Sequence, residues 1–170
     1  MKTYKVVVTG TFNAGKTAFI RAVSDIEIIT TERRITEPET AKVKEETTVA
    51  LDYGQVKLDN TRLHLYGTPG QARFDFMWDL LSGKADAFIL ILDSEDRGSL
   101  MEGLQIVRSL RKQVSAPYLV AANKQDTPRA LSAEEIRRLL KLSEEVPVVP
   151  CVAHDEESVR QVLERLLTLL

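Results

Sequence analysis

A glycine-rich segment at residues 10–17 has the residue types that bind phosphate. It reads Gly-Thr-Phe-Asn-Ala-Gly-Lys-Thr, which matches G-x-x-x-x-G-K-[ST], and it stands between a β-branched run and a helical pattern. Its glycines allow successive backbone N–H groups to point at one anion. Lys16 is expected to reach the β- and γ-phosphates, and the Thr17 hydroxyl to bind Mg²⁺. The alternative is a glycine turn beside a surface lysine. The predicted nucleotide contacts are Asn13, Ala14, Gly15, Lys16, Thr17 and Ala18.

A second polar segment, Asn-Lys-Gln-Asp at residues 123–126, indicates which base is bound. It follows an apolar run, and ligands of α/β sheets lie beyond the carboxyl ends of strands. Guanine offers N1–H and its 2-amino group as adjacent donors, and the Asp126 carboxylate can accept both. Adenine would leave that charge unpaired. We expect Asn123 to tie this loop to the phosphate loop and Lys124 to cover one face of the base. The alternative is a polar turn after a strand.

Together the two motifs resemble the Ras-type small GTPase family, and the likeness covers nearly all 170 residues. Residues 67–71, Gly-Thr-Pro-Gly-Gln, stand where the family has Asp-x-x-Gly-Gln, and residues 151–154, Cys-Val-Ala-His, stand where it has Ser-Ala-Lys. Segments 47–52 and 65–71 are most similar to the prokaryotic branch related to the gliding-motility GTPase MglA. The resemblance implies GTP and GDP with Mg²⁺ as cofactors, slow GTP hydrolysis, and a molecular switch that binds partner proteins.

The resemblance also assigns roles to single residues. Gln71 matches the glutamine that orients the attacking water, and Gly70 should donate its N–H to the γ-phosphate. Thr48 matches the switch I threonine that contacts Mg²⁺ and the γ-phosphate; Thr47 is the neighbouring alternative, and both could simply be strand formers. The Ala153 N–H matches the contact with the guanine carbonyl. The implied catalytic residues are Gln71, Lys16 and Thr48.

Three positions depart from the family pattern. Gly67 replaces the aspartate that steadies the metal, and Asp52 on the adjoining strand could supply a carboxylate instead. Asp52 could equally be a solvated strand residue. Phe12 stands where glycine is usual and should crowd the attacking water, which predicts slow turnover. His154 replaces a lysine, so it either loosens the base pocket or is only a surface residue. The implied metal set is Thr17, Thr48 and Asp52.

Activating and effector proteins are expected to bind through residues 30–48 and 67–80. The polar stretch 25–47 buries little apolar surface and should be mobile without ligand. It is either a functional loop or a surface insertion. Phe76 is the candidate docking residue, because aromatic side chains carry much interface energy. An arginine that completes catalysis could come from a partner or from this chain; the candidates are Arg33, Arg34 and Arg73.

Alternating apolar runs and helical patterns predict one domain over residues 1–170, with a three-layer α/β P-loop GTPase fold. We expect a six-stranded, mostly parallel sheet with one antiparallel edge strand and helices on both faces. The expected strands are 4–9, 48–57, 61–66, 86–92, 117–122 and 146–151, and the expected helices are 16–24, 72–82, 97–113, 132–142 and 155–169.

Composition limits the function further. The net charge of −2 and the lack of a long basic run argue against nucleic-acid binding. We see no apolar signal segment and no C-terminal lipidation box, and Cys151 is the single cysteine. We therefore expect a cytoplasmic monomer without a lipid anchor. Gly67 and Phe12 keep open a non-hydrolysing guanine-nucleotide-binding scaffold. A P-loop ATPase or nucleotide kinase is opposed by residues 123–126.

Overall fold

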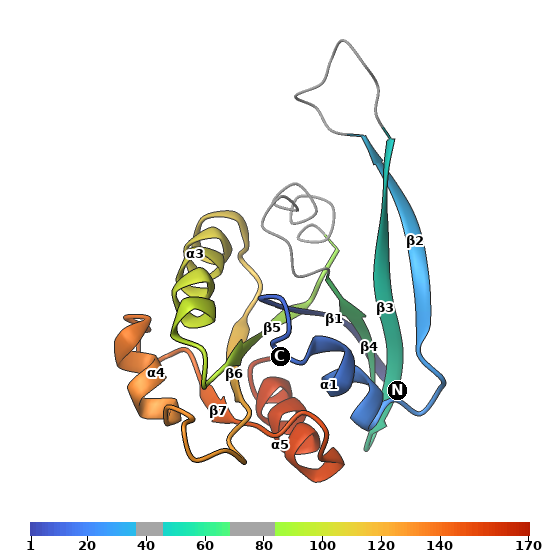
Figure 1. Cartoon of the computed structure of the whole chain (residues 1–170). Helices are drawn as coiled ribbons and strands as arrows, with labels where there is room; N and C mark the ends of the chain where they lie inside the picture. The colour runs from blue at the N-terminus through green and yellow to red at the C-terminus, as the bar shows by residue number, and fades with distance from the viewer. Residues whose placement is uncertain (37–45, 69–83) are drawn as a thin grey trace.

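The computed structural model describes residues 1–36, 46–68 and 84–170, and these form a seven-stranded sheet with helices packed against it (Figure 1). The strand order is β2-β3-β4-β1-β5-β6-β7. The strands are β1 (Lys2–Gly10), β2 (Ile29–Thr36), β3 (Glu46–Leu58), β4 (Thr61–Gly67), β5 (Ala87–Asp93), β6 (Tyr118–Asn123) and β7 (Val148–Pro150). The described helices are α1 (Lys16–Val23), α3 (Arg97–Gln113), α4 (Ala133–Leu139) and α5 (Glu156–Leu167).

The sheet has a parallel part and an antiparallel ribbon. β4, β1, β5, β6 and β7 run parallel, whereas β3 is antiparallel to both β4 and β2. The ribbon of β2 and β3 extends well past the ends of the other strands (Figure 1). The parallel strands direct their carboxyl ends to one edge of the sheet, which is the edge where ligands of α/β proteins bind.

The fold prediction is confirmed in class and wrong in strand number. The seventh strand is β2, which lies inside the stretch predicted to be a mobile loop. Its sequence is polar and shows no apolar alternation, so the pattern did not indicate a strand. An edge strand needs only one partner for its backbone, and β3 supplies that partner from Ile29 to Thr36. The helix expected at 72–82 lies outside the described residues.

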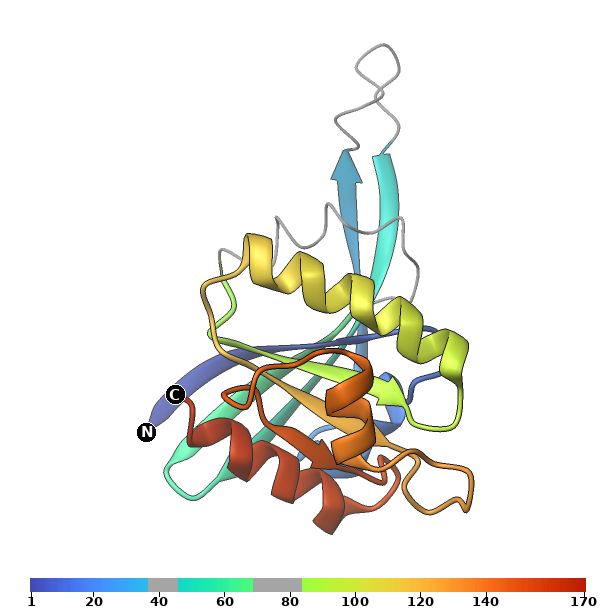
Figure 2. The ribbon, with the colours of Figure 1, turned by 90° about the vertical axis from the view of Figure 1, so that its left-hand side faces the viewer.

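Side chains of the central strands alternate between two apolar cores, one on each face of the sheet. Ile89 and Ile91 of β5 pack with α1 and α5, whereas Leu90 and Leu92 pack with α3 and α4. The face that α3 and α4 cover is the one turned to the viewer in Figure 2. All seven residues of β5 are buried. Burial of each Phe, Ile or Leu side chain among them contributes about 1.5–3 kcal/mol, so this core holds the loops at the strand ends in place.

Capping side chains fix where the helices begin. A capping box starts α4: Ser132 Oγ accepts from the Glu135 N–H, and the Glu135 carboxylate accepts from the Ser132 N–H. Asp96 caps α3 by accepting from the Ser99 N–H, and Asp155 caps α5 by accepting from the Glu157 N–H. The turn between β3 and β4 closes a hairpin, with Asp59 at φ 49°. Among the described helices, none is long and apolar enough to cross a membrane.

Candidate nucleotide-binding site

The phosphate loop leaves β1, enters α1, and needs glycine at two positions. Gly10 has φ 154°, and a Cβ there would lie 2.2 Å from the Ile91 carbonyl oxygen. Gly15 has φ 108°, and a Cβ there would lie 2.4 Å from Asn123 Nδ2. Asn13 adopts the left-handed conformation with φ 61°, which asparagine tolerates better than most residues. The loop therefore curls tightly against β5 and against residues 123–126, which are named the base loop below. Such a tight curl lets backbone N–H groups converge on one anion.

Lys16 lies folded over this loop. Its ammonium donates to the carbonyl oxygens of Gly10 and Thr11, at 3.0 and 2.7 Å. Burial lowers the pKa of Lys16 from 10.5 to about 8, and the negative charge of Asp52 opposes that shift. A phosphate bound at the loop would add negative charge beside the ammonium and favour its protonated form. Lys16 is therefore placed to neutralise phosphate oxygens.

Asp52 takes the place that the missing aspartate at position 67 would occupy. Asp52 and Gly67 lie opposite each other in β3 and β4. The Thr17 hydroxyl donates to Asp52 Oδ2 at 2.5 Å, and the Thr30 hydroxyl donates to Oδ1 at 3.4 Å. A hydroxyl and a carboxylate are oxygen donors of the kind that Mg²⁺ prefers. Thr17 and Asp52 thus form a donor pair that suits Mg²⁺.

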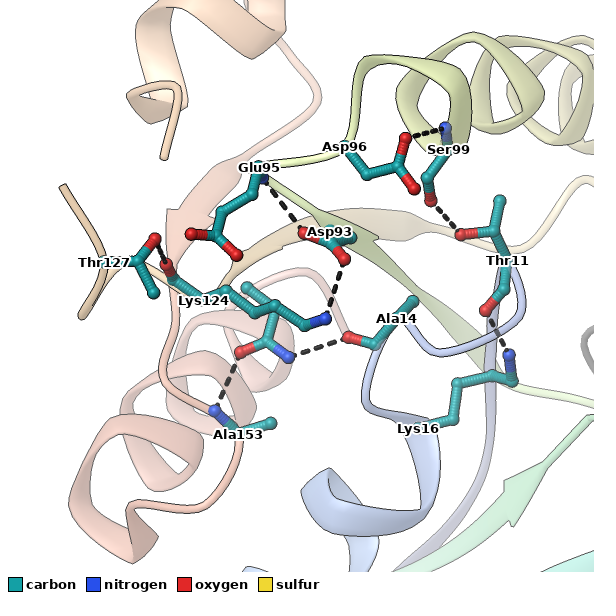
Figure 3. Close-up of polar contacts among 11 residues, drawn as sticks. Thr11, Ala14, Lys16, Asp93, Glu95, Asp96, Ser99, Lys124, Thr127 and Ala153 are labelled. Carbon is teal, nitrogen blue, oxygen red and sulfur yellow. Dashed lines mark hydrogen bonds and ion pairs between the residues drawn. The ribbon is translucent and has the colours of Figure 1, made fainter. Parts of the chain in front are cut away.

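Asn123 joins three loops at the carboxyl ends of the strands. Its Nδ2 donates to the Ala14 carbonyl at 2.7 Å, and its Oδ1 accepts from the Ala153 N–H at 2.8 Å. Asn123 itself ends β6, and only 3% of its surface is exposed. The tie between the base loop and the phosphate loop is thus as the sequence predicted (Figure 3). The Ala153 N–H, expected to meet the guanine carbonyl, here donates to Asn123.

The two residues expected to contact the base are held by acidic and basic partners. Lys124 has φ 67°, and its ammonium pairs with Asp93 Oδ2 at 2.7 Å, so its side chain reaches toward the end of β5 (Figure 3). Asp126 is half-exposed, and its Oδ2 lies 3.1 Å from His154 Nε2. His154 is therefore adjacent to the carboxylate that is predicted to recognise guanine.

The structure does not bring every predicted residue to this site. Thr48 lies on β3 opposite Arg34, and Thr47 lies opposite Ile35. Thr48 is four residues from Asp52, about 13 Å along the strand, so it is remote from Thr17. Thr30, which the sequence did not single out, lies beside Asp52 in addition to Thr17.

The remaining predicted residues are placed only in part. The backbones of Arg33 and Arg34 lie in β2. Phe12 is 71% exposed, so its ring points to solvent from the phosphate loop. The residues outside the described ranges are Gly70, Gln71, Arg73 and Phe76.

The sequence analysis did not single out the residues that contact and support the phosphate loop and the base loop. Asp93 ends β5, Ser94 follows it, and Ser99 lies in the first turn of α3. A signal for the first two was available, because polar residues after an apolar run at a strand's carboxyl end had already identified residues 123–126. Ser99 gave no such signal, since its contact with Thr11 joins residues far apart in the chain.

Comparison with known proteins identifies similar chains over most of this length. The family model of the ADP-ribosylation factor family matches residues 1–170. An uncharacterized protein of Methanocaldococcus jannaschii is 31% identical over 122 residues, which are 72% of this chain and 70% of that protein. ADP-ribosylation factor-like protein 3 of Chlamydomonas reinhardtii is 31% identical over 142 residues, or 82% and 72%. The mutual gliding-motility protein MglA of Myxococcus xanthus is 34% identical over 97 residues, or 53% and 50%.

Proposed function

This chain belongs to the ADP-ribosylation factor family, and on that premise we propose that it is a switch that hydrolyses GTP slowly and binds partner proteins in one nucleotide state. The resemblance to Ras-type small GTPases is confirmed. The narrower likeness to the MglA-related branch has weaker support, because MglA matches only about half of each chain. The chain is therefore a small GTP-binding protein of this family, and the cycle of switching between nucleotide states is what we propose.

One observation carries the proposal: hydrogen bonds of the Asn123 side chain join the phosphate loop and the base loop into a single site. The backbone N–H groups of the phosphate loop and the Lys16 ammonium supply positive charge for a nucleotide's phosphates. At the other end of the site, Asp126 offers a carboxylate to the two donors of guanine. A guanine nucleotide satisfies both ends at once, whereas an adenine nucleotide leaves Asp126 unpaired.

Thr17 and Asp52 would hold the metal, which would supply positive charge beside the phosphate oxygens of the nucleotide. Thr17 and Asp52 hold their oxygens together through a 2.5 Å hydrogen bond, so the donor pair is preorganised. Lys16 adds the second cation of the site. Because phosphoryl transfer depends on positioning and charge neutralisation, these groups would do most of the catalytic work, with Gln71 orienting water.

Switching would follow from the position of Thr48. In the described structure β2 pairs with β3 along Thr48, which keeps that residue remote from Thr17. If Thr48 binds the metal and the γ-phosphate, the ribbon must rearrange when GTP replaces GDP. The partner-binding segments 30–48 and 67–80 would then differ between the two states. Phe76→Ala is expected to weaken effector capture in the GTP form only, and undiminished capture would contradict that role.

Phosphate release from GTP and from ATP, with excess Mg²⁺, tests the proposal. Slow release from GTP alone is the expected result. Tight GTP binding with no release of phosphate would instead favour a non-hydrolysing scaffold. Gly67 and the exposed Phe12 are the residues that suggest this alternative. Equal release from ATP would contradict the role of Asp126. The single domain, the monomeric state and the cytoplasmic location stay predictions from the sequence.

A further inference from the structure

The turn that joins β5 to α3, residues 93–99, contacts both loops of the nucleotide site. It is named the β5–α3 turn below. Asp93 is 8% exposed, Ser99 is 7% exposed, and Ser94 is fully buried. Buried polar groups at a loop are costly unless each has a partner, so their partners indicate what the turn does.

One end of the turn holds the base loop. Asp93 Oδ2 pairs with the Lys124 ammonium at 2.7 Å, while Oδ1 accepts from the Glu95 N–H at 3.0 Å. Both oxygens of Asp93 are thus fixed, and the ion pair holds the Lys124 side chain in one place. Ser94 adds two contacts: its hydroxyl accepts from Gln125 Nε2 at 3.0 Å, and its N–H donates to the Asn123 carbonyl at 3.2 Å.

The other end holds the phosphate loop. The Ser99 hydroxyl forms a buried hydrogen bond with the Thr11 hydroxyl, and Asp96 fixes Ser99 by accepting from its N–H at 3.2 Å. Thr11 is 3% exposed, and its carbonyl accepts from the Lys16 ammonium at 2.7 Å. The same carbonyl accepts from the Ala14 N–H at 3.2 Å. Ser99 therefore acts on the residue against which Lys16 rests (Figure 3).

We propose that the β5–α3 turn is a positioning element of the nucleotide site, with Asp93 acting through Lys124 on the base and Ser99 acting through Thr11 on the phosphates. This inference rests on the proposed function. The physical reason is preorganisation: a lysine side chain that is already fixed loses less conformational freedom when a ligand arrives. The turn separates the two effects, because its two ends touch different parts of the site.

Calorimetric titration with GDP and with inorganic pyrophosphate, both with Mg²⁺, tests the base end. Asp93→Asn is expected to weaken GDP binding about tenfold and to leave pyrophosphate binding unchanged, because pyrophosphate has no base for Lys124 to cover. Glu95→Gln is the matched control, since it removes a neighbouring exposed carboxylate and should change neither affinity. In a Lys124→Met background, Asp93→Asn should have no further effect on GDP, because Asp93 then has nothing to position.

The phosphate end has its own cycle of variants. Ser99→Ala is expected to weaken GDP and pyrophosphate by the same factor, and Ser109→Ala on the same helix should change neither. The double variant with Thr11→Val and Ser99→Ala should bind pyrophosphate no more weakly than the single variant that has the lower affinity. These measurements hold even if Asp93→Asn does not fold.

Three results would overturn the inference: an Asp93→Asn loss shared equally by both ligands, an Asp93→Asn effect that persists without Lys124, or additive losses for Thr11 and Ser99. Unchanged affinities in all of these variants would also overturn it. Failure of the guanine-nucleotide binding on which this inference rests is a different result, because the wild-type chain would then bind no GDP at all.

Discussion

Asp52 and Gly67 lie directly opposite each other in β3 and β4, and the Cβ of Asp52 stands 3.3 Å from the point where a side chain on Gly67 would begin. The two positions therefore share one space, and only one of them can fill it with a carboxylate. The Thr17 hydroxyl donates to Asp52 Oδ2, so the carboxylate that fills the space is at the phosphate loop.

Asp52→Ala is expected to weaken Mg²⁺-dependent retention of GDP and GTP, because Thr17 loses its acidic neighbour. The measurement is the dissociation rate of a fluorescent guanine nucleotide with Mg²⁺ and with EDTA. We expect about a tenfold faster release in Mg²⁺, equivalent to about 1.4 kcal/mol, and little change in EDTA. Unchanged dissociation rates would reject this role, and Asp59→Ala in the β3–β4 turn is the control.

Exchanging the two residues is a sharper form of that test. Gly67→Asp alone should lower stability and nucleotide retention, because its Cβ would also lie 2.9 Å from the end of the Ile20 side chain and its charge would face Asp52. With Asp52→Gly added, the like charge and the crowding at Asp52 are gone. The double variant should regain Mg²⁺-dependent retention, and failure to regain it would mean that the two positions are not equivalent.

The sequence predicts an element or a contact well where residues close together in the chain determine it. The helix over residues 97–113 has the predicted bounds, and the buried run that forms β5 was recognised within one residue, because each has strong apolar periodicity or continuity. β2 was missed, since a polar edge strand gains its hydrogen bonds from a distant segment. In the site, the motif spacing predicted the Asn123 tie. The contacts of Ser99 could not be predicted, because they exist only in the folded chain.

The affinity for GDP should fall as the pH rises through about 8. Lys16 binds phosphate in its protonated form, and burial lowers its pKa to about 8 in the free protein. A bound phosphate raises that pKa again. The affinity for GDP is therefore greatest well below pH 8, where Lys16 is fully protonated, and it declines as the pH rises through 8. Between pH 7 and pH 9 the dissociation constant should rise about tenfold. Calorimetry in buffers of different ionisation enthalpy should find proton uptake at pH 8.5; no uptake would contradict the assignment.

Gly15→Ala should destabilise the fold as well as the site. The residue has φ 108°, and the added Cβ would lie 2.4 Å from Asn123 Nδ2, so the bond from Asn123 to Ala14 must break. Strain and the lost partner together should cost about 2–4 kcal/mol. Thermal or urea denaturation measures the loss. Gly98→Ala is the control, because its Cβ would meet only Asp96 Oδ1 at 3.3 Å. Equal stability of the two variants would show that the loop tolerates a side chain at Gly15.

Phe12→Gly should raise the rate of GTP hydrolysis. The ring projects from the phosphate loop and is 71% exposed, so its removal should not affect stability. If it crowds the attacking water or a partner's arginine, its loss should speed single-turnover phosphate release about three- to tenfold, a barrier change of about 0.7–1.4 kcal/mol. Phe12→Leu keeps a bulky side chain and should retain the wild-type rate. Identical rates for all three chains would remove Phe12 from the explanation of slow turnover.

The most direct test of the whole account is a calorimetric titration of the chain with GDP and with ADP, both in the presence of Mg²⁺. We expect a one-to-one complex with GDP and binding to ADP at least about a hundredfold weaker, because adenine offers Asp126 neither an N1–H nor a 2-amino group. Equal heats and affinities for the two nucleotides, or no heat with GDP, would contradict it.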